Sequence, residues 1–158
     1  MKYDISALGN ALVDTQYMVD HDFLDEIGLE ADSMTLASAE EHSPIIDKLE
    51  SMGVESVSDC GGSATNSLVA ASYYGSKCHH VCRVANDEDG KKYLESLQKA
   101  GVQHIGYSKE DSEMPTGKCL IFVTPDAKRT MSSMLGISAY LGSKDINYDA
   151  INLSLIHI

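Results

Sequence analysis

Short apolar segments alternate with amphipathic segments along most of the chain, and this alternation limits the fold more than any other feature. Strand-like runs are expected at residues 3–8, 54–57, 78–84 and 102–107. Apolar residues at helical spacing predict helices at residues 39–52, 64–74 and 87–100. Strands that alternate with helices favour a mostly parallel sheet covered by helices. The sequence therefore predicts an α/β fold.

The pattern changes after residue 116, where two strand-like runs follow each other directly. They are residues 117–124 and 129–135, and the Pro125-Asp126-Ala127-Lys128 turn joins them into a hairpin. The run 15–19 beside this hairpin would complete a small second sheet. Such a sheet next to the main one is typical of a lid.

Net charge and hydrophobicity exclude two classes of partner. Lys and Arg total 12 against 24 Asp and Glu, a formal charge of −12 that repels phosphate backbones and argues against nucleic acid. No apolar run reaches membrane-spanning length, and the start resembles no signal peptide. We expect a cytoplasmic protein with reduced cysteines.

The segment Asp59-Cys60-Gly61-Gly62-Ser63-Ala64-Thr65-Asn66-Ser67 is the strongest candidate for a binding site. Two glycines allow close backbone approach, and they immediately precede a predicted helix. Free N–H groups at a helix N-terminus can hold an anion or hydroxyl oxygens. Asn66 adds a donor and an acceptor. The alternative is that Gly61-Gly62 is only a tight turn.

A second candidate follows the first predicted strand. Asn10 and Asp14 lie four positions apart just beyond Leu8. Ligands of open α/β sheets bind outside the carboxyl ends of the strands. Alternatively, Asp14 is a loop cap, the commoner role of a lone Asp.

Together these segments resemble the PfkB, or ribokinase-like, family of sugar and nucleoside kinases. The resemblance rests on Gly9-Asn10 with Asp14, on Gly61-Gly62 with Asn66, and on Thr116-Gly117 and Arg129-Thr130-Met131. Within the family, the chain is most similar to bacterial adenosine kinase-like members. The implied fold is ribokinase-like, with a small β-sheet lid.

The resemblance also implies an activity, which is ATP-dependent phosphorylation of the hydroxymethyl group of a ribose-bearing nucleoside or a sugar. Asn10, Asp14, Gly61, Gly62, Ser63 and Asn66 would bind the substrate. Arg129 would contact the substrate or the transferred phosphoryl group. ATP and Mg²⁺ are the implied cofactors, and the lid would carry a homodimer contact.

Two departures from the family pattern affect this interpretation. Ala85 stands where the first family signature usually has glycine, and the second signature, Asp-Thr-x-Gly-Ala-Gly-Asp, does not occur in these 158 residues. We therefore expect residues 1–152 to be the N-terminal part of a kinase domain without its catalytic base and most of its ATP site, inactive alone. Residues 153–158 are either the next sheet strand or a non-native tail.

Three rival hypotheses remain open at this stage. The chain could be a non-catalytic fragment that binds a sugar or nucleoside. Cys78, His80 and Cys82 would share one face of a strand and could bind a metal, although they lack the usual Cys-x2-Cys spacing. Cys60, at a helix N-terminus, could be a nucleophile.

Overall fold

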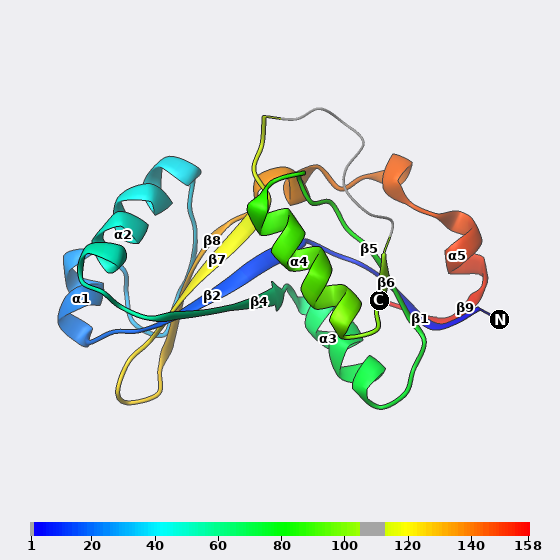
Figure 1. The fold of residues 1–158 in the computed structure, drawn as a ribbon, viewed down its shortest axis with the longest axis horizontal. Helices are drawn as coiled ribbons and strands as arrows, with labels where there is room; N and C mark the ends of the chain where they lie inside the picture. The colour runs from blue at the N-terminus through cyan, green and yellow to red at the C-terminus, as the bar shows by residue number, and fades with distance from the viewer. Residues whose placement is uncertain (1, 105–112) are drawn as a thin grey trace. The chain divides into compact units, whose positions relative to one another are not determined.

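The computed structural model describes residues 2–104 and 113–158, and its chain divides into two compact units (Figure 1). Unit 1 comprises Met1–Val13, Asp59–Gly117 and Leu135–Ile158. Unit 2 comprises Asp14–Ser58 and Lys118–Met134. Each unit is built around its own sheet and its own apolar cluster.

Unit 1 contains a four-stranded sheet in the order β6-β5-β1-β9, and every pairing in it is parallel. The strands are β1 (Tyr3–Leu8), β5 (Cys78–Val81), β6 (Gln103–His104) and β9 (Ser154–His157). The helices are α3 (Ser63–Tyr73), α4 (Glu88–Lys99) and α5 (Tyr148–Asn152), with 3₁₀ turns η1 (Gly136–Tyr140) and η2 (Ser143–Asp145). The predicted parallel sheet is therefore present, but the strand predicted at residues 54–57 belongs to the second sheet, and Ser154–His157 supplies the fourth strand instead.

The core of unit 1 lies between this sheet and its helices. α3 packs on β1 and β5, α4 contacts β6, and α5 packs on β1 and β9. Leu68 of α3 and three side chains of α4, Tyr93, Leu94 and Leu97, are buried in one cluster with Ala7 of β1. Every residue of β5 is buried, as expected for a strand that has neighbours on both sides.

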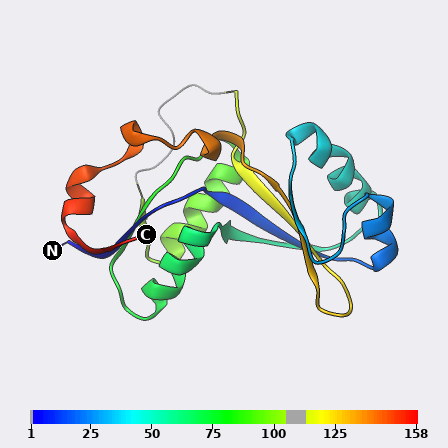
Figure 2. The same cartoon turned by 180° about the vertical axis from the view of Figure 1, so that it is seen from behind.

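The second sheet has five strands in the order β3-β8-β7-β2-β4. They are β2 (Leu12–Met18), β3 (Met34–Leu36), β4 (Ser56–Gly61), β7 (Gly117–Val123) and β8 (Arg129–Met134). β7 and β8 form the predicted antiparallel hairpin (Figure 2), and β3 adds to β8 in parallel. The hairpin and the strand beside it were predicted, whereas β3 was not, because three residues carry too little periodicity.

Helices α1 (His21–Glu26) and α2 (Ala39–Ser51) belong to unit 2. Phe23 and Leu24 of α1 and Leu49 of α2 are buried against Tyr17 of β2 and Phe122 of β7. The predicted capping box of α2 is present, because Ser38 Oγ accepts from Glu41 N–H and the Glu41 carboxylate accepts from Ser38 N–H.

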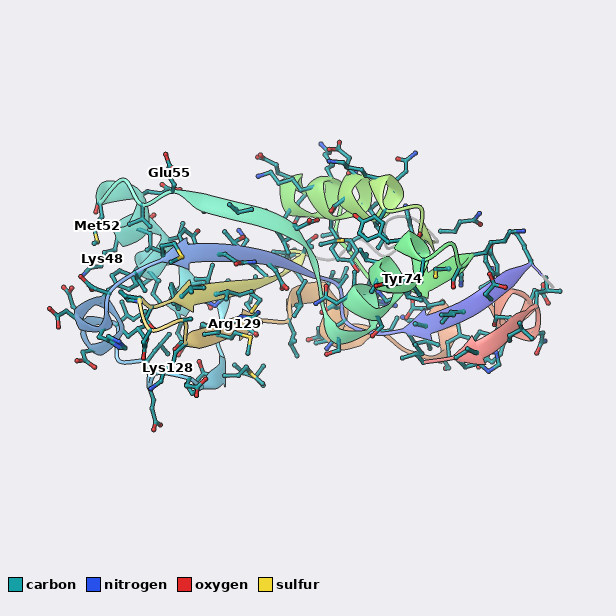
Figure 3. All side chains as sticks on the ribbon, turned by 90° about the horizontal axis from the view of Figure 1, so that it is seen from below. Lys48, Met52, Glu55, Tyr74, Lys128 and Arg129 are labelled. Carbon is teal, nitrogen blue, oxygen red and sulfur yellow. The ribbon has the colours of Figure 1, made fainter. Side chains whose placement is uncertain are left out.

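Several sequence-based boundaries need correction. α3 ends at Tyr73, and Tyr74, which was predicted on its apolar face, is 93% exposed (Figure 3). The inward side chains of α3 are instead Ala64, Thr65 and Leu68. β2 starts earlier than residue 15, and β4 runs into the glycines rather than ending at residue 57. The end of the predicted strand 102–107 lies outside the described residues.

Within the described ranges, none of the helices combines the length and apolar character needed to cross a membrane.

Asp87 links the start of α4 to the start of β7, and its removal should destabilise unit 1. Its carboxylate accepts from Gly90 N–H (2.7 Å), Thr116 N–H (2.8 Å) and Thr116 Oγ1–H (2.7 Å). We expect Asp87→Ala to lower the unfolding free energy by about 2–3 kcal/mol, measured by urea denaturation, since a cap and a buried anchor are lost together.

The control for this prediction is the neighbouring Glu88→Ala, which removes only an exposed pair with Lys92 and should cost less than about 1 kcal/mol. Equal losses for Asp87→Ala and Glu88→Ala would contradict the anchoring role of Asp87.

Candidate functional site

The Gly61–Gly62 turn joins β4 directly to α3. Gly61 is the last residue of β4, Ser63 is the first of α3, and Gly62 is the helix N-cap with φ 105° and ψ 145°. No side chain caps this helix. The first N–H groups of a helix have no partner inside it, and an uncapped helix N-terminus of this kind is chemically suited to binding oxygen atoms.

Gly62 cannot carry a side chain in this conformation. A Cβ atom there would overlap the backbone oxygen of Asn10 and lie 3.3 Å from Thr65 Oγ1. The positive φ also disfavours any L side chain. The glycine thus lets the turn pack directly on the backbone of Asn10, which brings two separately predicted segments together in unit 1.

Five of the seven predicted binding residues lie in this part of unit 1: Asn10, Gly61, Gly62, Ser63 and Asn66. Ser63 and Asn66 are exposed on the first turn of α3. The amide of Asn66 donates to the carbonyl of Gly62 at 2.9 Å. This is a backbone hydrogen bond, and the exposed Asn66 side chain adds a donor and an acceptor beside the uncapped helix end.

The other two predicted residues, Asp14 and Arg129, belong to unit 2. Asp14 is half-buried on β2, and Arg129 is exposed at the start of β8, beside Lys128 on the hairpin (Figure 3). Burial raises the pKa of the Cys119 thiol on β7, and the Asp14 charge raises it further, while the Ser133 hydrogen bond and the Arg129 charge lower it. Asp14 and Arg129 therefore present opposite charges around β7.

A buried polar network behind the turn escaped the sequence analysis. Thr65 Oγ1 lies 3.1 Å from His80 Nε2 and 2.8 Å from the Tyr93 hydroxyl, and His80 Nδ1 lies 3.2 Å from the Ala7 carbonyl. Thr65, His80 and Tyr93 have no exposed surface. One signal was available in the sequence, since Thr65 is a polar residue between the inward positions Ala64 and Leu68.

Within the described ranges, the cysteine and histidine cluster is part of the buried core. Cys78, His79, His80 and Cys82 are all buried, and no three His, Cys, Asp or Glu side chains of the described residues form a group able to hold a metal. Burial also raises the pKa of the Cys60 thiol, the opposite of what activates a nucleophile. All four cysteines are free.

Comparisons with known proteins agree with the fold and identify the family. The family described as pfkB family carbohydrate kinase matches residues 34–156. Ribokinase from Mus musculus is 29% identical over 96 residues, which cover 60% of this chain and 29% of that protein. Adenosine kinase 1 from Arabidopsis thaliana is 27% identical over 137 residues, covering 84% of this chain and 38% of that protein.

Among solved structures, the adenosine kinase from Sinorhizobium meliloti superposes with a TM-score of 0.86 at 28% identity. A probable sugar kinase from Rhizobium etli superposes with a TM-score of 0.87 at 26% identity. Each comparison covers 99% of this chain and 46% of the other. The predicted ribokinase-like fold is confirmed, and the chain spans less than half the length of these relatives.

Because the network behind the turn needs a neutral imidazole, the stability of the chain should fall in acid. Burial is the main cause that lowers the pKa of His80 from 6.5 to about 4, opposed by the Ala7 hydrogen bond and reinforced by His79 and His104. A folded pKa below the unfolded one means that stability is complete above pH 6.5 and is lost as the pH falls towards 4. The shift corresponds to about 3 kcal/mol.

Urea denaturation at pH 7, 5.5 and 4.5 measures this loss. His80→Gln should flatten the pH dependence, although it lowers stability at pH 7. His21→Gln removes an exposed histidine that pairs with Asp126. It serves as the control and should change the slope much less than His80→Gln, because the pair is exposed to solvent. An unchanged slope in His80→Gln would contradict the assignment.

Proposed function

Since the chain belongs to the pfkB family of carbohydrate kinases, we propose that it is the substrate-binding part of a kinase for a ribose-bearing nucleoside, adenosine foremost, or for a free sugar. The proposed reaction is transfer of the terminal phosphoryl group of ATP to the substrate's hydroxymethyl oxygen. The observation that carries the proposal is the Gly61–Gly62 turn at an uncapped helix N-terminus, packed on Asn10 with Asn66 exposed beside it.

The proposal gives a chemical task to the start of α3 and to the side chains of Asn66, Asp14 and Arg129. The N–H groups at the start of α3 donate to sugar oxygens, and the Asn66 side chain donates and accepts. The Asp14 carboxylate accepts hydrogen bonds from two neighbouring hydroxyls, which orients the ring. With its secondary hydroxyls held, the sugar keeps its CH₂OH group free for in-line attack. Arg129 supplies positive charge to the substrate or to the transferred phosphoryl group.

ATP and Mg²⁺ enter the proposal on family grounds. Kinases hold Mg²⁺ with one or two carboxylates together with the phosphates of the nucleotide. Among the described residues, no three ligating side chains form a group that could hold a metal, and no residue of this chain is proposed as a Mg²⁺ ligand. Adenosine as the first substrate is supported by the Sinorhizobium meliloti and Arabidopsis thaliana relatives, which are adenosine kinases.

A second candidate function is binding of the same ligand without catalysis. The binding geometry in unit 1 is equally suited to it, because nothing in that geometry depends on ATP. Turnover of ATP by the 158-residue chain, measured with and without adenosine, separates the two candidates. We propose that the chain alone binds without turnover.

Calorimetric titration of the chain with adenosine, ribose and fructose tests the binding proposal directly. Asp14→Ala should weaken binding of the preferred ligand by about 10–150-fold, since hydrogen bonds to a charged group contribute about 1.5–3 kcal/mol. Asp14→Asn should weaken binding less than Asp14→Ala, because asparagine keeps one hydrogen-bond acceptor. Glu55→Ala removes an exposed carboxylate of the same unit (Figure 3) and should leave affinity unchanged.

If none of adenosine, ribose and fructose binds, the proposal is contradicted for this chain. Equal effects of Asp14→Ala and Glu55→Ala would contradict only the role of Asp14.

A homodimer through the second sheet is the proposed assembly. Four large apolar side chains are exposed on this sheet: Met18 of β2, Met34 and Leu36 of β3, and Val57 of β4. Exposed apolar surface favours a protein contact. Sedimentation equilibrium should show a dimer, and Leu36→Lys should shift it towards monomer. Tyr74→Lys alters an equally exposed site on unit 1 and should not. A monomer at every concentration would contradict the assembly.

A further inference from the structure

We infer that Thr65, His80 and Tyr93 are positioning residues, which hold the Gly61–Gly62 turn and the first turn of α3 in the geometry that binds substrate. The inference rests on the proposed function, because it explains how a turn that lacks a cap stays in one conformation. These three side chains have no exposed surface. They cannot touch a ligand themselves, so they affect binding through the turn that they hold in place.

The hydrogen bonds of this network can run in one direction only. The Ala7 carbonyl is solely an acceptor, so His80 Nδ1 carries the proton and donates to it. In the neutral ring Nε2 then accepts, and its donor is the hydroxyl of Thr65. Having used its proton, Thr65 Oγ1 accepts from the hydroxyl of Tyr93. Each of the three side chains is therefore the required partner of the next.

This one-way chain of bonds joins four elements of unit 1: α4 through Tyr93, α3 through Thr65, β5 through His80 and β1 through Ala7. Two of its members, Thr65 and Ala7, lie close to the candidate binding residues in the sequence. Thr65 is the third residue of α3, three positions after Gly62, and Ala7 lies three positions before Asn10. The network thus connects the backbone segments that carry the proposed binding groups.

The position of Thr65 compensates for the missing cap. Most helices begin with a side chain that bonds a free N–H of the first turn, which fixes the chain there. Gly62 has none, and such a bond would occupy a donor that the ligand needs. Thr65 fixes the same turn from its buried side, and its Oγ1 stands 3.3 Å from the site of a Cβ on Gly62. The N–H groups stay open while the turn stays ordered.

The backbone N–H of Asn66 reports on this turn, because it donates to the carbonyl of Gly62 at 2.9 Å. Its hydrogen exchange rate measures how often the turn opens. Thr65→Val keeps the shape of the side chain but removes the hydroxyl, which leaves His80 Nε2 and the Tyr93 hydroxyl without their buried partner. Thr65→Ser restores the hydroxyl.

The experiment combines this exchange rate with the dissociation constant for adenosine, both measured on the 158-residue chain under conditions where every variant is folded. Thr65→Val should raise the exchange rate of the Asn66 amide and the dissociation constant about tenfold, and Thr65→Ser should return both towards wild type. Tyr93→Phe removes the first donor and should also raise the exchange rate and the dissociation constant. This second variant keeps the test available if Thr65→Val does not fold.

Val102→Ala is the matched control, since Val102 is buried in the same apolar cluster but takes no part in the network. It should lower the denaturation midpoint and leave the Asn66 exchange rate and the affinity unchanged. Equal exchange in Thr65→Val and wild type would overturn the inference, as would an equal effect of Val102→Ala. If wild type binds no adenosine, ribose or fructose, the proposed function fails, and the exchange rates still decide the inference.

Discussion

The contact between Gly62 and the backbone of Asn10 is the constraint on which the candidate site depends. A side chain at Gly62 would overlap the Asn10 oxygen, so the turn before α3 exists in this form only because a glycine occupies it. The same contact joins the end of β4 to the chain that follows β1. The result is an uncapped helix start with one exposed amide side chain beside it, which is the proposed binding surface.

The buried polar side chains of unit 1 show how this surface is supported. Polar groups inside a core are stable only when each finds a partner, and a partly satisfied network costs more than an apolar one. Thr65, His80 and Tyr93 meet this condition with the Ala7 carbonyl as the final acceptor. In this network a neutral imidazole is a structural requirement, and burial, the main cause that lowers the pKa of His80, favours that neutral form.

Sequence reasoning succeeded where a local pattern has one physical meaning. Ser38 and Glu41 form the capping box that their spacing predicts, and Tyr93, Leu94 and Leu97 point inward from α4. It was wrong about Tyr74, because helical spacing continues in the sequence after the helix has ended. It also missed the role of Thr65: the position of Thr65 between the inward residues Ala64 and Leu68 indicated burial, but nothing local identified His80 and Tyr93 as its partners.

By itself the sequence determined the α/β class, the family, the glycine turn and the identity of the candidate binding residues. These follow from periodicity and from short motifs, which depend on neighbouring residues alone. Only the tertiary structure decided that Asn10 lies against Gly62 and that His80 accepts from Thr65. Those contacts join residues far apart in the chain, and their geometry depends on how helices and strands pack, which no local pattern encodes.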